Sequence, residues 1–230
     1  MDINGNINKY VNLKLKSMKF IKPHYEILSP INGDEILKNI EIAARTCYKS
    51  EDKISNDSAR KLVTSLITRG HEAMLEFGDI TIKFVCDRGV SHEIVRHRVA
   101  SYAQESTRYC NYSKDKFGNE LTFITPVFWD NCPENGLDCE KHGILETVLV
   151  EAEKAYNKLI ELGASPQEAR YILPNGLKTE IVVKMNLREL RHFFTLRCSK
   201  AAHPQMRELA IPLLNELQSK IPIIFDDIKH

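Results

Sequence analysis

Residues 96–109 read RHRVASYAQESTRY, and they bring three arginines, one histidine and several hydroxyl or amide side chains together in a short stretch. Arginine stays charged and presents a planar fork of donors that fits phosphate oxygens. An apolar core has no place for such a cluster, because a buried charge without a partner is costly. The stretch therefore predicts a binding site for a polyanionic small molecule.

The pattern on either side of this stretch predicts the fold. Ser91-His92-Glu93-Ile94-Val95 is typical of the start of a short helix over 91–100, with Ser91 as its N-cap, and a polar loop is expected over 101–119. We predict an α+β fold, in which helices frame a small mixed or antiparallel sheet. Apolar alternation and breaker residues predict strands over 19–28 (broken at Pro23), 77–86, 121–124 and 179–185. Helical periodicity predicts helices over 34–47, 55–68, 137–162, 186–199 and 203–220, and a short helix that begins at Pro166.

Composition and charge exclude several classes of protein. The 230 residues, 43% of them hydrophobic, suffice for one packed domain over 18–230, preceded by a loose polar leader over 1–17. A net charge of +1 gives no general attraction to nucleic acid or membranes. No apolar run is long enough to span a membrane and no signal peptide is evident, so we expect a cytoplasmic protein.

Six cysteines are scattered along the chain without Cys-x-x-Cys spacing, which disfavours a structural zinc site. In a cytosol they are expected to be reduced thiols. Cys132 and Cys139 could approach each other in a loop, although two separate thiols are the simpler expectation.

The helix expected to begin after Asn186 has two contrasting faces. At about 100° per residue, Arg197 falls inside the apolar arc of this helix, where a lone charge is costly. Three explanations stay open for Arg197: an internal carboxylate partner, a snorkelling side chain or an anionic ligand. The apolar face consists of Leu187, Leu190, Phe193, Phe194 and Cys198, and the polar face of Arg188, Arg191, His192 and Thr195.

The arginine-rich stretch carries a family resemblance. Arg96-His97-Arg98, then seven residues, then Ser106 and Arg108 is similar to the signature of the flavin-dependent thymidylate synthases. Three further segments resemble that family in the same order, and together the four cover 70–197. These segments are Gly70–Phe77, Ala169–Pro174 and Asn186–Arg197.

The resemblance implies the fold of that family and an enzyme that methylates dUMP to dTMP. The carbon would come from 5,10-methylenetetrahydrofolate, the hydride from reduced FAD, and the reducing power from NADPH, with tetrahydrofolate released. A homotetramer with active sites shared between subunits is also implied. No nucleic acid, membrane or metal is expected as a partner.

Site residues follow from the same resemblance. Arg197 is the expected catalytic residue, because a fixed cation beside the pyrimidine of dUMP favours its N3-deprotonated form. FAD is assigned to His71, Ala73, Arg96, His97, Arg98, Gln104, Asn186, Leu187, Arg188 and His192. The substrate dUMP is assigned to Glu93, Ile94, Val95, Arg96, Gln104, Glu105, Ser106, Thr107, Arg108, Arg170 and Arg197.

The residue types at three of these positions limit their roles. The Glu105 carboxylate is repulsive toward phosphate, so we expect it to point away from the nucleotide. Ser106 is expected to bind phosphate rather than to act as a nucleophile, since no activating base is evident nearby. His192 stands where some family members have asparagine, so the nature of its contact with FAD is open.

Other interpretations of the same residues are weaker. A nucleic-acid-binding module built on 96–112 is disfavoured by the near-neutral charge, and a non-catalytic scaffold with interface ion pairs stays an alternative. His71, His92 and His97 lack the spacing of a metal site. The chain has no Gly-x-Gly-x-x-Gly motif, so arginines rather than a Rossmann turn are expected to hold FAD. Cys110 and Cys198 match no family nucleophile.

Overall fold

The computed structural model describes residues 19–114, 118, 120–129 and 137–230, so the predicted leader over 1–17 and Cys132 lie outside the described residues. Packing divides the chain into two compact units. The α5 unit comprises the chain up to Lys22, Asp87–Gly89 and Glu105–Thr179, and the α7 unit comprises Pro23–Cys86, Val90–Gln104 and Glu180–His230. Each unit has its own hydrophobic core.

The α7 unit is built on a four-stranded sheet in the order β2-β3-β6-β4. Its strands are β2 (His24–Ile27), β3 (Asp79–Asp87), β6 (Lys178–Asn186) and β4 (Ala100–Gln104), with β2 antiparallel to β3 and β4 antiparallel to β6. Ile80, Ile82 and Phe84 alternate into the core, as expected for a half-buried strand. The strands predicted over 77–86 and 179–185 are confirmed.

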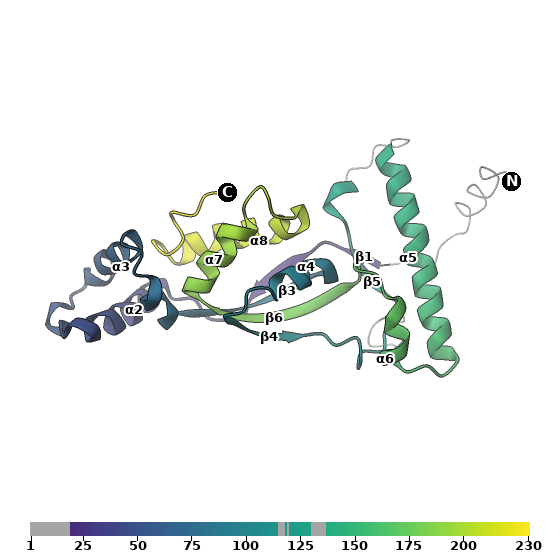
Figure 1. Ribbon diagram of the computed structural model, residues 1–230, viewed down its shortest axis with the longest axis horizontal. Helices are drawn as coiled ribbons and strands as arrows, with labels where there is room; N and C mark the ends of the chain where they lie inside the picture. Colours follow the sequence, from purple (N-terminus) through teal and green to yellow (C-terminus); the bar gives the residue numbers. More distant parts are fainter. Residues whose placement is uncertain (1–18, 115–117, 119, 130–136) are drawn as a thin grey trace. The chain divides into compact units, whose positions relative to one another are not determined.

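Helices cover this sheet. In Figure 1, α7 (Leu187–Arg197) and α8 (Pro204–Lys220) lie over one face, where Phe193 of α7 contacts Phe84 of β3 at 6.2 Å between ring centroids. The core continues into α2 (Gly33–Tyr48) and α3 (Ser58–Thr68). Pro212 is accommodated inside α8, as predicted. The short 3-10 turn η1 (Glu51–Lys53) lies between α2 and α3, and a second one, η2 (Glu72–Phe77), connects α3 to β3.

Helix α4 (Arg88–Ile94) corrects the prediction of a helix capped by Ser91. It begins directly after β3, so Ser91 lies inside the helix, fully buried, and its hydroxyl accepts a hydrogen bond of 2.9 Å from Gln104 Nε2. Val90 and Ile94, one turn apart, are both buried in the core. This packing outweighs the low helix propensity of Gly89, which is why local signals misplaced the start.

Strand β4 corrects the prediction of a loop over 101–119, because the irregular part of that stretch begins only after Gln104. Tyr102 of β4 lies opposite Val183 of β6, and burial alternates along the strand. The residues of β4 are mostly small or polar, so their intrinsic strand preference is weak, and pairing with β6 determines their conformation.

The α5 unit has a smaller core around a parallel pair of strands, β1 (Lys19–Ile21) and β5 (Thr122–Ile124). The long helix α5 (Leu137–Glu161) contributes Tyr156, which is fully buried with Phe123. Next come α6 (Pro166–Ala169) and the turn η5 (Arg170–Ile172), and η4 (Val127–Trp129) follows β5. The predicted break at Pro23, the long helix and the helix opening at Pro166 are confirmed, and the whole is an α+β fold. No helix in the described part of the chain could cross a membrane.

Candidate functional site

Helix α7 begins where the sequence predicts. The Asn186 side chain accepts a hydrogen bond of 2.8 Å from the backbone N–H of Glu189, so Asn186 is the N-cap. The predicted apolar face is fully buried in the core, which fixes the rotation of the helix about its axis. The helix ends at Arg197, and burial raises the pKa of the following thiol, Cys198, to about 11. Such a thiol is protonated near neutral pH.

Arg197 is held by internal partners. Its Nη1 lies 2.8 Å from Glu93 Oε2, and its Nη2 donates to the Glu93 carbonyl oxygen at 3.0 Å. Its Nε donates to His97 Nε2 at 3.1 Å. Of the three explanations left open by the sequence, the structure contains the internal carboxylate. A guanidinium has five N–H donors, so two N–H groups of Arg197 are not used in these contacts.

His97 is buried between Arg197 and Glu189. Its Nδ1 lies 2.9 Å from Glu189 Oε1. Because a guanidinium can only donate, His97 Nε2 must be the bare acceptor, and the proton of the neutral ring is on Nδ1, where it is donated to Glu189. Burial lowers the pKa of His97 most, Glu189 opposes this shift, and the positive charge of Arg197 adds to it. The ring is therefore neutral at pH 7.

Two further contacts position the turn that carries His97. The Tyr102 hydroxyl of β4 lies 3.0 Å from the Ile94 carbonyl oxygen and also contacts the carbonyl oxygen of His97. The His192 ring meets the His97 ring edge-on at 5.5 Å between centroids. The predicted site residues Glu93, His97, His192 and Arg197 are thus brought together in the α7 unit.

His97, Glu189 and His192 also form a group that could hold a metal ion, with one ligand atom from each within 4.8 Å of the others. This is not the histidine set whose spacing was weighed in the sequence. Both ring nitrogens of His97 are already engaged, by Glu189 and by Arg197. A metal ion would have to displace one of these partners, so the geometry favours the hydrogen-bonded cluster.

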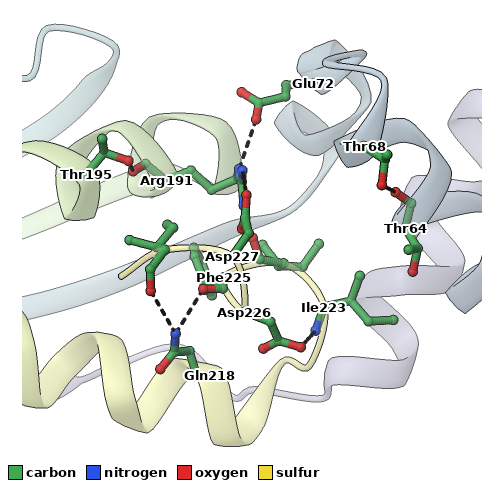
Figure 2. A network of polar contacts seen from close by, with 12 residues as sticks. Thr64, Thr68, Glu72, Arg191, Thr195, Gln218, Ile223, Phe225, Asp226 and Asp227 are labelled. Carbon is green, nitrogen blue, oxygen red and sulfur yellow. Dashed lines mark hydrogen bonds and ion pairs between the residues drawn. The ribbon is translucent and has the colours of Figure 1, made fainter. Parts of the chain in front are cut away.

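Arg191, predicted on the polar face of the helix, is nevertheless buried, since the residue is only 9% exposed. Its Nη1 and Nη2 each lie 2.7 Å from a carboxylate oxygen of Asp227, and its Nε donates to Glu72 at 3.0 Å (Figure 2). It also contacts the Ile224 carbonyl oxygen. The turn η2 and the C-terminal segment cover this side of α7, which a helix wheel cannot show.

Several other residues assigned to FAD are exposed, and they differ in whether their side chains have partners. Arg188 is exposed and pairs with Glu76 at 2.7 Å, and His71 and Ala73 are exposed at the N-terminal end of η2. Arg96 and Arg98 are exposed just after α4, and no described residue pairs with either guanidinium. Cationic groups of this kind are available to an anionic ligand.

The α5 unit holds the loop assigned to the dUMP phosphate. Lys178 Nζ lies 3.0 Å from Glu105 Oε2, and the Tyr112 hydroxyl donates to Glu105 Oε1 at 2.8 Å. The Ser106 hydroxyl oxygen accepts from the Arg108 backbone N–H at 3.3 Å. The Glu105 carboxylate is therefore neutralised within its own unit. Its orientation relative to a bound phosphate stays a prediction.

Two arginines of the α5 unit differ in their contacts. Arg108 donates to Gln167 at 3.1 Å and lies over the Tyr109 ring at 5.5 Å. Arg170 is exposed, and no partner for its side chain occurs among the described residues. Sequence reasoning missed the residues that hold the site residues in place, namely Glu189, Glu76, Lys178 and Tyr112, and it also missed Glu72 and Asp227, the partners of Arg191. Only Glu189 carried a local signal, as an acid three residues after a cap, and that signal predicts a capping box instead.

Comparisons with known proteins identify the family of this chain. The family model described as thymidylate synthase complementing protein matches residues 31–223. A flavin-dependent thymidylate synthase of Geobacter sulfurreducens is 33% identical over 196 residues, which is 82% of this chain and 80% of that protein. The protein of the same name from Pyrococcus furiosus is 35% identical over 200 residues, 84% of this chain and 77% of the relative. The chain therefore belongs to the family of flavin-dependent thymidylate synthases.

Proposed function

We propose that this enzyme methylates dUMP to dTMP, with 5,10-methylenetetrahydrofolate as carbon donor and NADPH as reductant, and releases tetrahydrofolate. Family membership supports thymidylate synthesis and dependence on a flavin. The observation that carries the proposal to this chain is Arg197, a half-buried cation held by three internal contacts with two donors to spare. That arrangement suits recognition of a ring that becomes anionic.

The residues present fit FAD as the flavin. Arg96 and Arg98 offer two guanidinium groups that make no ion pair within the described ranges, and a pyrophosphate needs such donors. His192, which is exposed and whose ring meets the His97 ring edge-on, adds ring nitrogens close to this stretch. When bound, FAD would carry the hydride from NADPH to the transferred carbon. We assign it to His71, Ala73, Arg96, His97, Arg98, Gln104, Asn186, Leu187, Arg188 and His192.

We propose that different residues bind the ring and the phosphate of dUMP. Arg197 would stabilise negative charge on the pyrimidine through its two remaining N–H groups. Arg108, Ser106 and Thr107 would bind the phosphate through the guanidinium, the hydroxyls and the backbone. The other proposed contacts are Glu93, Ile94, Val95, Arg96, Gln104, Glu105 and Arg170.

We further propose a homotetramer that shares its active sites, in the cytoplasm. Tyr109 and Tyr171, each next to a residue assigned to dUMP, are 77% and 94% exposed in the single chain. Contiguous exposed patches of large side chains mark association surfaces, and we propose these two residues as part of such a surface. Light scattering should give a mass near four times 26.4 kDa. A monomer that makes dTMP would contradict shared sites.

A spectroscopic cycle tests the proposed reaction. Purified protein should bind FAD and absorb at flavin wavelengths. NADPH should bleach it under anaerobic conditions, and the addition of methylenetetrahydrofolate with dUMP should restore the absorbance and yield dTMP by mass spectrometry. Omission of dUMP is the control. The proposal would be overturned if the protein did not bind FAD or formed no dTMP. The scaffold alternative predicts no heat on titration with dUMP, and the nucleic-acid alternative predicts a shifted band with oligonucleotides.

A further inference from the structure

Glu189 does not act as its position in the helix predicts. It is the third residue of α7 after an asparagine cap, where a glutamate usually returns to the cap of its own helix. Glu168 of α6 does so, accepting from the Ser165 backbone N–H at 2.8 Å. Glu189 instead reaches His97, 92 positions earlier in the chain, and its side chain is only 12% exposed. Its carboxylate thus serves a residue of the site.

The hydrogen bond between His97 and Glu189 determines whether His97 can accept a hydrogen bond from Arg197. Arg197 Nε presents a hydrogen to His97 Nε2, so this nitrogen must carry none. The neutral ring then needs an acceptor for its proton at Nδ1, and Glu189 Oε1 is that acceptor at 2.9 Å. In the other tautomer, or after protonation, two N–H groups would face each other and the contact with Arg197 would be lost.

We propose that Glu189 is a positioning residue that holds His97 as the Nδ1–H tautomer, so that the bare Nε2 fixes the Arg197 guanidinium for the pyrimidine of dUMP. This inference rests on the proposed function and adds a residue to it. Glu93 holds the Nη1 and Nη2 side of the same guanidinium. Glu189 and Glu93 therefore restrain Arg197 from two directions, one of them through an imidazole.

The inference predicts a pH dependence because the neutral form of His97 is required. The charged and titratable groups facing His97 are Glu189, His192 and Arg197 of α7, with Glu93 of α4 beyond Arg197. Burial, Arg197 and His192 lower the pKa of His97, and only Glu189 raises it. Affinity for dUMP should fall as the pH falls through that pKa. Removal of the Glu189 charge should move this acid limb to lower pH.

Calorimetric titration of dUMP into FAD-saturated protein tests the inference. At pH 8, Glu189→Ala should bind dUMP roughly tenfold more weakly, the factor expected for one charge-assisted hydrogen bond. Glu189→Gln keeps an acceptor for Nδ1–H, so its affinity should stay within about threefold of the wild type. The matched control is Glu35→Ala, because Glu35 is exposed and follows the cap Asn32 in the same way. It should bind as the wild type does.

The acid limb separates positioning from a general structural role. Glu189→Gln should retain affinity to lower pH than the wild type, whereas a general loss of stability would move the loss of affinity to higher pH. The phosphate of dUMP titrates in the same range, but it is common to all variants. Wild-type affinity in Glu189→Ala, or an unmoved limb in Glu189→Gln, would overturn the inference alone. Wild-type protein that binds no dUMP would overturn the proposed function and this inference with it.

Discussion

Arg191 and Asp227 join the middle of α7 to the C-terminal segment through two parallel contacts of 2.7 Å (Figure 2). Glu72 accepts from the third nitrogen of the same guanidinium, so all three nitrogens of Arg191 are bound. A buried arginine of this kind needs its partners, because removing one leaves a desolvated charge without full compensation. This ion pair therefore stabilises the helix that carries Arg197.

Asp227→Asn should lower the free energy of unfolding by about 1–2 kcal/mol, measured by urea denaturation. We expect this loss of stability to be smaller than for a fully buried ion pair, since the Asp227 side chain is 53% exposed and solvent screens its charge. The control is Asp226→Asn. The Asp226 carboxylate accepts a hydrogen bond of 2.9 Å from the Ile223 backbone N–H, and the asparagine side chain keeps an oxygen that can accept it. Equal stability of the two variants would contradict this role of Asp227.

The same pair predicts how stability varies with pH. The Arg191 hydrogen bonds hold the pKa of Asp227 below its usual range. A lowered carboxyl pKa contributes stability that is present above the unfolded-state value of about 3.9, and this stability is lost as the pH falls through the folded-state value. The wild type and Asp227→Asn should therefore converge in unfolding free energy in acid. A difference that persists in strong acid would rule out this linkage.

Arg197→Ala should abolish dTMP formation, with a fall of at least about a hundredfold, as expected when a preorganised charge at the reacting group is removed. The fold should stay intact, because the released Glu93 is partly exposed to water. Arg197→Lys should fail as well, since one ammonium cannot reach His97 and both Glu93 oxygens as the fork does. Product analysis and melting temperature are the measurements. Unchanged turnover in either variant would remove Arg197 from the mechanism.

Ser106→Ala should weaken dUMP binding a few-fold and leave measurable dTMP formation. The hydroxyl oxygen accepts from the Arg108 backbone N–H, so its loss removes one polar contact of the loop rather than a reacting group. Steady-state kinetics with varied dUMP should show the change mainly in KM. Complete loss of turnover with normal dUMP binding would instead favour Ser106 as a nucleophile.

Lys178→Met should also weaken dUMP binding, although Lys178 is not proposed to contact the nucleotide. Its ammonium neutralises Glu105, which would otherwise be a negative charge next to Ser106 in the phosphate loop. The double variant Lys178→Met with Glu105→Gln should recover most of the affinity, because no carboxylate then needs compensation. Calorimetry on the four proteins measures the coupling. Additive effects would show that the pair does not act through charge.

Elements with a local signal could be predicted from the sequence. The alternation along β3 and the cap at Asn186 depend on residues within a few positions of each other, and both were placed correctly. Ser91 and β4 were misjudged because the start of α4 and the pairing of β4 with β6 depend on tertiary packing. Local propensity is a weak guide wherever packing opposes it.

The partners of charged residues could not be predicted in the same way. The helix wheel assigns Arg191 to the polar face without indicating its burial, because its partners Glu72 and Asp227 lie 119 and 36 positions away in the chain. Glu93, the carboxylate beside Arg197, is 104 positions away, so the sequence left three explanations for Arg197 open. The roles assigned to these residues toward FAD and dUMP stay predictions.

The three contacts of Arg197 bear on the thermodynamics of ligand recognition. A free arginine side chain loses up to about 2 kcal/mol of rotamer entropy when it is immobilised. In this protein that loss occurs when the chain folds, since His97 and Glu93 already restrict the guanidinium. An arriving nucleotide therefore meets a cation whose conformational freedom is already gone, and a larger share of the electrostatic attraction remains as net affinity.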